Sequence, residues 1–161
     1  MVCDFLDDLR VQKHARPSWD EIWMQVVDTI SQRSADPNFR VAAIVVTADN
    51  TQLIALGYNG DHSGGDNRRE SDAPGESGFI HAEVNALIKM DYNNPKRKIM
   101  YVSMSPCKMC AKAIINAGIS EVVFKDSYRD SSGIVLLESA GIKVRKINRL
   151  IADKQDENNN V

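Results

Sequence analysis

The pattern of apolar and polar positions predicts strands that alternate with helices along most of the chain. A first helix is predicted after Ser18, because Glu21 three residues later completes a capping-box pattern and apolar residues then recur on one face. Two β-rich runs at 40–50 and 51–60 meet around Asp49, which predicts an antiparallel hairpin.

The second half of the chain repeats a strand-then-helix order. Strand-like runs occupy residues 98–105, 119–127 and 142–148, and helix-like runs occupy residues 81–90, 107–118 and 131–141. A crossover helix is what joins neighbouring parallel strands, so these three strands are expected to be parallel. We therefore predict an α/β fold of three α/β/α layers, with a mixed five-stranded sheet covered by helices on both faces.

Length and composition support a single domain. The 161 residues, of which 43% are hydrophobic, fit one domain around its own core, predicted at 18–150. Residues 1–17 form a polar leader, and residues 151–161 form a polar tail expected to be disordered. Between the predicted elements, residues 60–78 are so dense in Gly, Ser, Asp and Pro that we expect a long surface loop, a candidate cover for a site.

Charge and hydropathy narrow the class of partner. A net charge of −2 gives no bulk reason to expect nucleic acid or an anionic membrane as a partner. No apolar run is long enough to cross a bilayer, and the acidic start is unlike a secretory signal, so we expect a cytoplasmic protein. Three cysteines make a poor disulfide framework, and a close pair in a reducing compartment favours metal binding or catalysis.

Two predicted helix starts carry the candidate chemistry. His81 and Glu83 open one helix, and Cys107 and Cys110 open the next, directly after a strand. Thiolates are favoured at a helix N-terminus, and two thiolates with one histidine leave one open position on a tetrahedral zinc ion, as in catalytic sites. Glu83 is placed to move a proton between water and a substrate.

The cysteine pair is also compatible with two further kinds of site. One is a redox pair, although the late position of the cysteines after the third strand weakens that interpretation. The second is a closed structural zinc site, which would need a fourth ligand, for which Cys3, His14 and His62 are available.

The order of the two motifs is more specific than either motif alone. H-x-E followed by P-C-x-x-C is the signature of zinc-dependent nucleobase deaminases, and it is complete here. The chain resembles the cytidine deaminase superfamily and, within it, the deoxycytidylate (dCMP) deaminase family. The resemblance spans about residues 18–148 and rests on GYNG at 57–60, HAEVNAL at 81–87, residues 100–124 and SYRDSSG at 127–133.

This resemblance implies a reaction and a set of residues. The reaction is hydrolysis of dCMP to dUMP and ammonia, which feeds dTMP synthesis, with a zinc cofactor. It implies that His81, Cys107 and Cys110 bind the metal and that Glu83 is the catalytic acid and base. It also implies substrate contacts from the backbone near Ala82 and Ser105 to the pyrimidine edge, from Asn59 to the sugar, and from Tyr128 near the sugar or phosphate.

The residues that bind the phosphate are not fixed by any spacing rule. The cationic candidates are Arg40, Lys108, Arg68, Arg69 and Arg129. Of these, we predict that Arg40 binds the substrate. From the residues alone, Asn59 is also explained as a turn residue and Tyr128 as a core aromatic.

Finer points of the resemblance concern substrate and regulation. The parallel last strand is associated with deoxycytidylate, guanine and tRNA-adenosine deaminases and argues against free cytidine. dCTP, 5-methyl-dCMP, guanine and tRNA adenosine remain open as substrates, as does a non-catalytic zinc-stabilised module. Ala42 stands where Gly is common, and His62 where Pro is usual, in a region associated with allosteric control by dCTP and dTTP, which leaves that control open. Family members are commonly homohexamers, so we expect a homo-oligomer.

Overall fold

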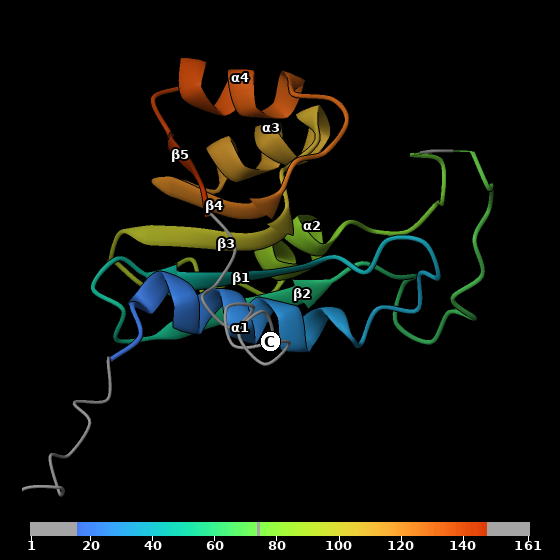
Figure 1. Ribbon diagram of the computed structural model, residues 1–161, viewed down its shortest axis with the longest axis horizontal. Helices are drawn as coiled ribbons and strands as arrows, with labels where there is room; N and C mark the ends of the chain where they lie inside the picture. The colour runs from blue at the N-terminus through green and yellow to red at the C-terminus, as the bar shows by residue number, and fades with distance from the viewer. Residues whose placement is uncertain (1–15, 74, 148–161) are drawn as a thin grey trace, which may run out of the picture.

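The structure is a computed structural model that describes residues 16–73 and 75–147. Most of the predicted leader and all of the predicted tail lie outside these residues. Within the described ranges, one mixed sheet contains five strands in the order β2-β1-β3-β4-β5 (Figure 1). The strands are β1 (Ala42–Thr47), β2 (Leu53–Tyr58), β3 (Lys98–Met104), β4 (Glu121–Asp126) and β5 (Lys143–Lys146).

The strand directions are those predicted. β1 is antiparallel to both β2 and β3, whereas β3, β4 and β5 are mutually parallel. The hairpin between β1 and β2 turns at Asn50, which takes the positive φ of 60° that asparagine tolerates in tight turns. The central place of β1 between β2 and β3 did not follow from the sequence pattern, because periodicity identifies strands but not their neighbours.

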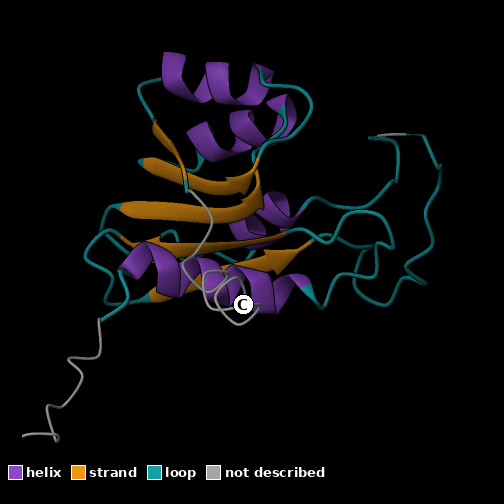
Figure 2. Cartoon of the chain, in the orientation of Figure 1, coloured by secondary structure: helices purple, strands orange, loops and turns teal. Residues whose placement is uncertain are grey.

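Among the described residues, four helices cover the two faces of the sheet (Figure 2). They are α1 (Trp19–Ser31), α2 (Ala82–Ile88), α3 (Lys108–Asn116) and α4 (Ser132–Ser139). On one face, Met24 and Val27 of α1 pack against Ile44 and Tyr101 of the sheet. On the other face, residues of α2, α3 and α4 join the larger core cluster. The three-layer α/β/α prediction is therefore confirmed.

The first helix begins as its sequence predicts. Ser18 is the N-cap, its side chain accepts a hydrogen bond from the Glu21 backbone, and the Glu21 carboxylate accepts one from the Ser18 backbone. In the part of the chain that the structure describes, no helix combines the length and apolarity needed to cross a membrane.

The strand directions bring several chain ends to one edge of the sheet. β2, β3 and β4 all run the same way, so the residues that follow them lie at a common edge, together with the segment that enters β1. These segments are 36–41, 59–60, 105–107 and 127–129. α2 packs against β2, and α3 begins just after β3, so both helix starts face the same edge.

Candidate functional site

Three metal-ligand side chains meet between the starts of α2 and α3. His81 is the N-cap residue of α2, Cys107 is the N-cap of α3, and Cys110 lies in the first turn of α3. The predicted helix at 107–118 therefore begins one residue later than expected, and Cys107 accepts a hydrogen bond from the Cys110 backbone. The His81 Nδ1 atom lies 3.6 Å from Cys107 Sγ and 3.3 Å from Cys110 Sγ.

The arrangement of these donor atoms fits zinc. All three ligand atoms lie within 4.8 Å of one another. Tetrahedral zinc, with Zn–S near 2.3 Å and Zn–N near 2.0 Å, separates its ligand atoms by roughly 3.5 to 3.8 Å. One nitrogen and two sulfurs are also a donor set that zinc prefers. These three residues are therefore suited to hold the ion.

The described residues provide three ligands to this group and no fourth. His62, a possible fourth ligand from the sequence, is exposed, and its Nδ1 lies 2.8 Å from Asp61 Oδ1 instead. The other two possibilities, Cys3 and His14, lie outside the described residues. Three protein ligands leave one position for water or substrate, as catalytic zinc sites require.

Hydrogen bonds within the cluster shift the pKa values of all three side chains. The hydrogen bonds from the Cys110 thiol and then from His81 lower the pKa of Cys107 to about 3. The pKa of Cys110 is raised, first by its hydrogen bond to Cys107 and second by burial. The hydrogen bond with Cys107 raises the pKa of His81. One thiolate is thus already stable here, and a metal ion that replaces the shared proton would stabilise the second.

Glu83 lies in the first turn of α2, two residues beyond His81. Its side chain is 3% exposed, and burial raises the pKa of its carboxyl group. A buried carboxyl group with a raised pKa holds a proton more readily than an exposed one, which suits the role of a general acid and base. Glu83 also lines a cavity, so its carboxyl group is accessible to a substrate bound there.

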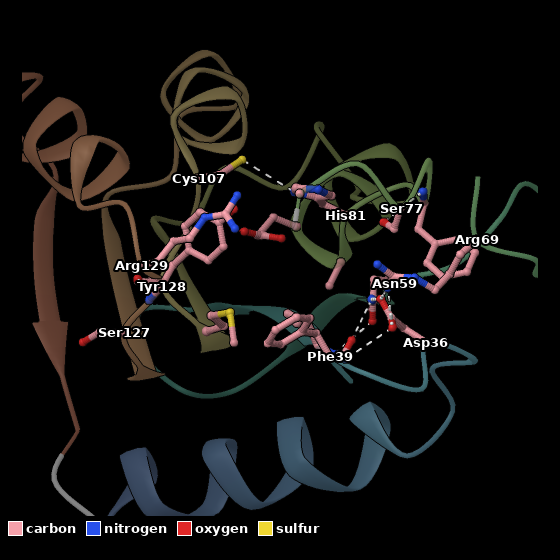
Figure 3. A pocket seen from close by; sticks show the side chains of 17 residues that line it. Asp36, Phe39, Asn59, Arg69, Ser77, His81, Cys107, Ser127, Tyr128 and Arg129 are labelled. Carbon is pink, nitrogen blue, oxygen red and sulfur yellow. Dashed lines mark hydrogen bonds and ion pairs between the residues drawn. The ribbon is translucent and has the colours of Figure 1, made fainter. Parts of the chain in front are cut away.

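A cavity of about 330 Å³ opens beside this cluster (Figure 3). Its volume falls within the range typical of small-molecule sites. The lining combines the edge segments of the sheet with the long loop before α2. The lining residues are Asp36, Phe39, Val41, Asn59, Arg69, Gly75, Ser77, Phe79, His81, Ala82, Glu83, Met104, Ser105, Cys107, Ser127, Tyr128 and Arg129.

Four of the five predicted substrate-binding residues line this cavity. Ala82 and Ser105 are buried in its wall, and the Ser105 hydroxyl accepts a 2.7 Å hydrogen bond from the Tyr128 backbone. Asn59 and Tyr128 also line it. Arg40, the fifth, is exposed and is not among the lining residues. Whether any of the five touches substrate stays a prediction.

The Asn59 side chain is fully engaged with protein atoms. Its Oδ1 accepts hydrogen bonds from Ser34 Oγ at 2.7 Å and from the Val41 backbone at 2.9 Å. Its Nδ2 donates to the Phe39 carbonyl at 2.9 Å and faces Asp36 Oδ2 at 3.4 Å. A hydrogen bond from Asn59 to a sugar would therefore use an atom, Oδ1 or Nδ2, that already has a protein partner.

Two of the five candidate cations reach the cavity. Arg69 and Arg129 line it, whereas Lys108 and Arg68 do not. The Arg129 guanidinium lies over the Tyr128 ring, 5.4 Å from the ring centroid. Arg69 is paired with a buried carboxylate.

Sequence reasoning missed several residues of the cavity wall. Phe39, Met104 and Phe79 supply apolar surface, and Asp36 and Ser77 supply polar groups. The one available signal was Phe39, a large apolar residue within the polar stretch that precedes a predicted strand. Its side chain is 54% exposed, which is unusual for an aromatic residue beside a core.

Known proteins match most of this chain. The family model described as the cytidine and deoxycytidylate deaminase zinc-binding region matches residues 17–126, which contain the metal ligands and Glu83. Human deoxycytidylate deaminase is 37% identical over 141 residues, covering 80% of this chain and 79% of the human protein. The deoxycytidylate deaminase of Mycobacterium phage D29 is 33% identical over 125 residues, covering 68% of this chain and 96% of the phage protein.

A solved structure is similar in fold as well as in sequence. The dCMP deaminase of cyanophage S-TIM5, in complex with dCMP and dUMP, has a TM-score of 0.72 and 33% identity. The match covers 83% of this chain and 100% of the cyanophage chain. The similarity therefore extends over most of this chain.

Proposed function

The chain belongs to the family of zinc-dependent cytidine and deoxycytidylate deaminases, and we propose that it hydrolyses dCMP to dUMP and ammonia. The observation that carries the proposal is the placement of a buried Glu83 beside a three-ligand zinc site, on the wall of a nucleotide-sized cavity. A structural zinc site would need neither the buried acid nor the cavity.

The reaction needs a nucleophile, a proton carrier and a fixed substrate. His81, Cys107 and Cys110 would hold the zinc ion, whose Lewis acidity would make a water molecule nucleophilic at neutral pH. Glu83 would take one proton from the attacking water and deliver it to the ring nitrogen next to the amino-bearing carbon. It would then take a second proton from the new hydroxyl group on that carbon and deliver it to the amino group, which leaves as ammonia when the C–N bond breaks. The burial that raises the pKa of Glu83 suits it to both transfers.

Substrate contacts form the finer part of the proposal. The backbone near Ala82 and Ser105 would bind the pyrimidine edge, because both residues lie in the cavity wall next to Glu83. Asn59 and Tyr128 would lie against the sugar and phosphate. For the phosphate, we keep the prediction that Arg40 binds it. Arg129 is a second candidate, because it lies in the cavity wall.

The proposal extends to assembly and location. Four of the eight large exposed apolar side chains among the described residues lie on β2, on α2 or just after α2: Leu53, Leu56, Ile88 and Tyr92. Such surface is typical of an interface, which supports a homo-oligomer, proposed here as a hexamer. A cytoplasmic location fits a site whose two cysteines must stay reduced to bind zinc.

The proposal is tested by ammonia release from zinc-loaded protein incubated with dCMP, dCTP, deoxycytidine or guanine. We expect turnover of dCMP, and we expect Glu83→Gln to lower kcat by about 10²- to 10⁴-fold with zinc still bound in a 1:1 ratio. Stoichiometric zinc without turnover of any of the four compounds would contradict the proposal and favour a zinc-stabilised binding module.

A further inference from the structure

A mostly buried ion pair joins two distant segments at the cavity wall. Arg69 Nη1 lies 2.9 Å from Asp36 Oδ1 and 3.0 Å from Asp36 Oδ2, and the two side chains are 12% and 4% exposed. Arg69 belongs to the 60–78 loop, whereas Asp36 belongs to the segment between α1 and β1 (Figure 3). Removing one member of such a pair leaves an uncompensated buried charge, so the pair fixes the two segments relative to each other.

On its own side, Asp36 organises the segment that leads into β1. Its Oδ1 accepts hydrogen bonds from the backbone of Asn38 at 2.9 Å and of Phe39 at 3.2 Å. Asn59 Nδ2 in turn holds the Phe39 carbonyl. The backbone of Phe39 is thus bound at both of its polar groups, while its ring stays half exposed in the cavity wall.

On the other side, Arg69 anchors the long loop. The loop closes at its base through reciprocal backbone hydrogen bonds between Gly60 and Ile80, and again where the Glu70 backbone donates to the Ser77 carbonyl at 2.9 Å. Arg69 stands next to this second closure. Ser77 and Phe79 line the cavity. Their positions therefore depend on where Arg69 anchors the loop.

We propose that Arg69 is a positioning residue for the nucleotide, which acts by tying the 60–78 loop to Asp36 and so fixing the cavity wall that contains Phe39, Asn59 and Ser77. This inference rests on the proposed function. Because Asp36 matches the charge of Arg69, and Asp72 Oδ1 lies a further 3.7 Å from its Nε, this arginine is better suited to hold the wall in place than to bind the phosphate of the substrate.

The test compares two neighbouring arginines. Arg69→Gln removes the buried pair, and Arg68→Gln is the matched control, because Arg68 is 84% exposed and pairs 3.2 Å away with Asp66, itself 63% exposed. Arg69→Lys keeps the charge and tests rescue. Each variant is loaded with zinc and measured for zinc content, kcat and KM with dCMP, and amide hydrogen exchange of peptides that cover residues 60–80.

For Arg69→Gln we expect faster exchange in residues 60–80 and a rise in KM of about tenfold or more, with zinc content unchanged and a smaller effect on kcat. Arg68→Gln should match the wild type, and Arg69→Lys should fall between the wild type and Arg69→Gln. A purely structural role would lower the active fraction without raising KM, and that result would overturn the proposal, as would unchanged exchange.

The proposed function and this inference fail in different ways. A wild-type protein that binds zinc but does not turn over dCMP would overturn the proposed function and the nucleotide-positioning role together. Normal wild-type turnover with equal KM values for Arg69→Gln and Arg68→Gln would overturn the positioning role alone.

Discussion

Gly57 of β2 lies directly against Ala82, the first residue of α2. A methyl group at position 57 would overlap the Ala82 carbonyl oxygen and the Ala86 backbone nitrogen. The helix that begins with His81 and Glu83 is therefore seated on the sheet by backbone-to-backbone contact that only glycine allows. The first glycine of the GYNG motif thus acts on the metal site through the position of a helix.

Gly57→Ala is expected to push α2 away from β2 and to disturb His81 and Glu83. Overpacking of this kind costs about 1 to 3 kcal/mol of unfolding free energy. We expect zinc affinity and dCMP turnover to fall together, because both depend on where α2 begins. Zinc titration with a competing chelator, thermal unfolding and turnover of the same preparation measure the three effects.

Gly64→Ala is the control for the Gly57 variant. Gly64 has a φ of +84°, but a methyl group there would meet no atom within 4 Å. This change should cost about 1 to 2 kcal/mol through backbone strain alone and leave zinc affinity unchanged. Equal loss of zinc affinity in both variants would contradict the positional role of Gly57.

Substitution of single candidate ligands distinguishes a three-ligand zinc site from a closed four-ligand site. Cys110→Ser should lose most bound zinc and lower the melting temperature, because zinc joins the starts of α2 and α3 and bound ligand stabilises the folded state. Cys3→Ser and His62→Ala should keep zinc and activity. Zinc lost on substitution of Cys3 or His62 would instead indicate a closed structural site.

The sequence predicted those features that depend on local patterns. The Ser18–Glu21 capping box located the start of α1, and the hairpin and crossover helices gave the correct strand directions. The motif spacing identified the three residues that meet as a metal cluster, because each stands at a helix start beside the same sheet edge.

What the sequence did not predict depends on contacts between distant segments. Nothing local indicates that Arg69, rather than Arg68, is buried, or that its partner lies 33 positions earlier in the chain. The cavity wall was missed for the same reason, since Phe39 and Met104 come together only when the strands are assembled. Arg40 illustrates the limit, because residue type alone could not place it inside or outside the cavity.

The ion pair between Asp20 and Arg145 should make stability depend on acid pH. Arg145 Nη1 lies 2.6 Å from Asp20 Oδ2, and the hydrogen bond with Arg145 is the largest cause of the lowered pKa of Asp20. A carboxyl group with a lowered pKa in the folded state stabilises the protein above its unfolded pKa, near 3.9, and this contribution is lost as pH falls through the folded pKa.

Urea unfolding between pH 2 and pH 6 measures this effect. Asp20→Asn should be less stable than the wild type at pH 6, and the difference should shrink as the solution is acidified. Arg145→Gln should flatten the same pH dependence, since it removes the main cause of the shift. It also removes the 2.6 Å contact with Glu121, so its loss of stability at pH 6 should be the larger. A pH dependence unchanged in both variants would refute the assignment to this pair.

Assembly is tested at the edge formed by β2 and α2. Light scattering should give a mass of about six times the 17.9 kDa chain, and Ile88→Glu should reduce it, because Ile88 is 70% exposed and a buried carboxylate would disrupt an interface there. Val135→Glu is the matched control on α4, where Val135 is 61% exposed. A monomeric wild type would refute the oligomer, and an Ile88→Glu variant that dissociates no more than Val135→Glu would contradict an interface at β2 and α2.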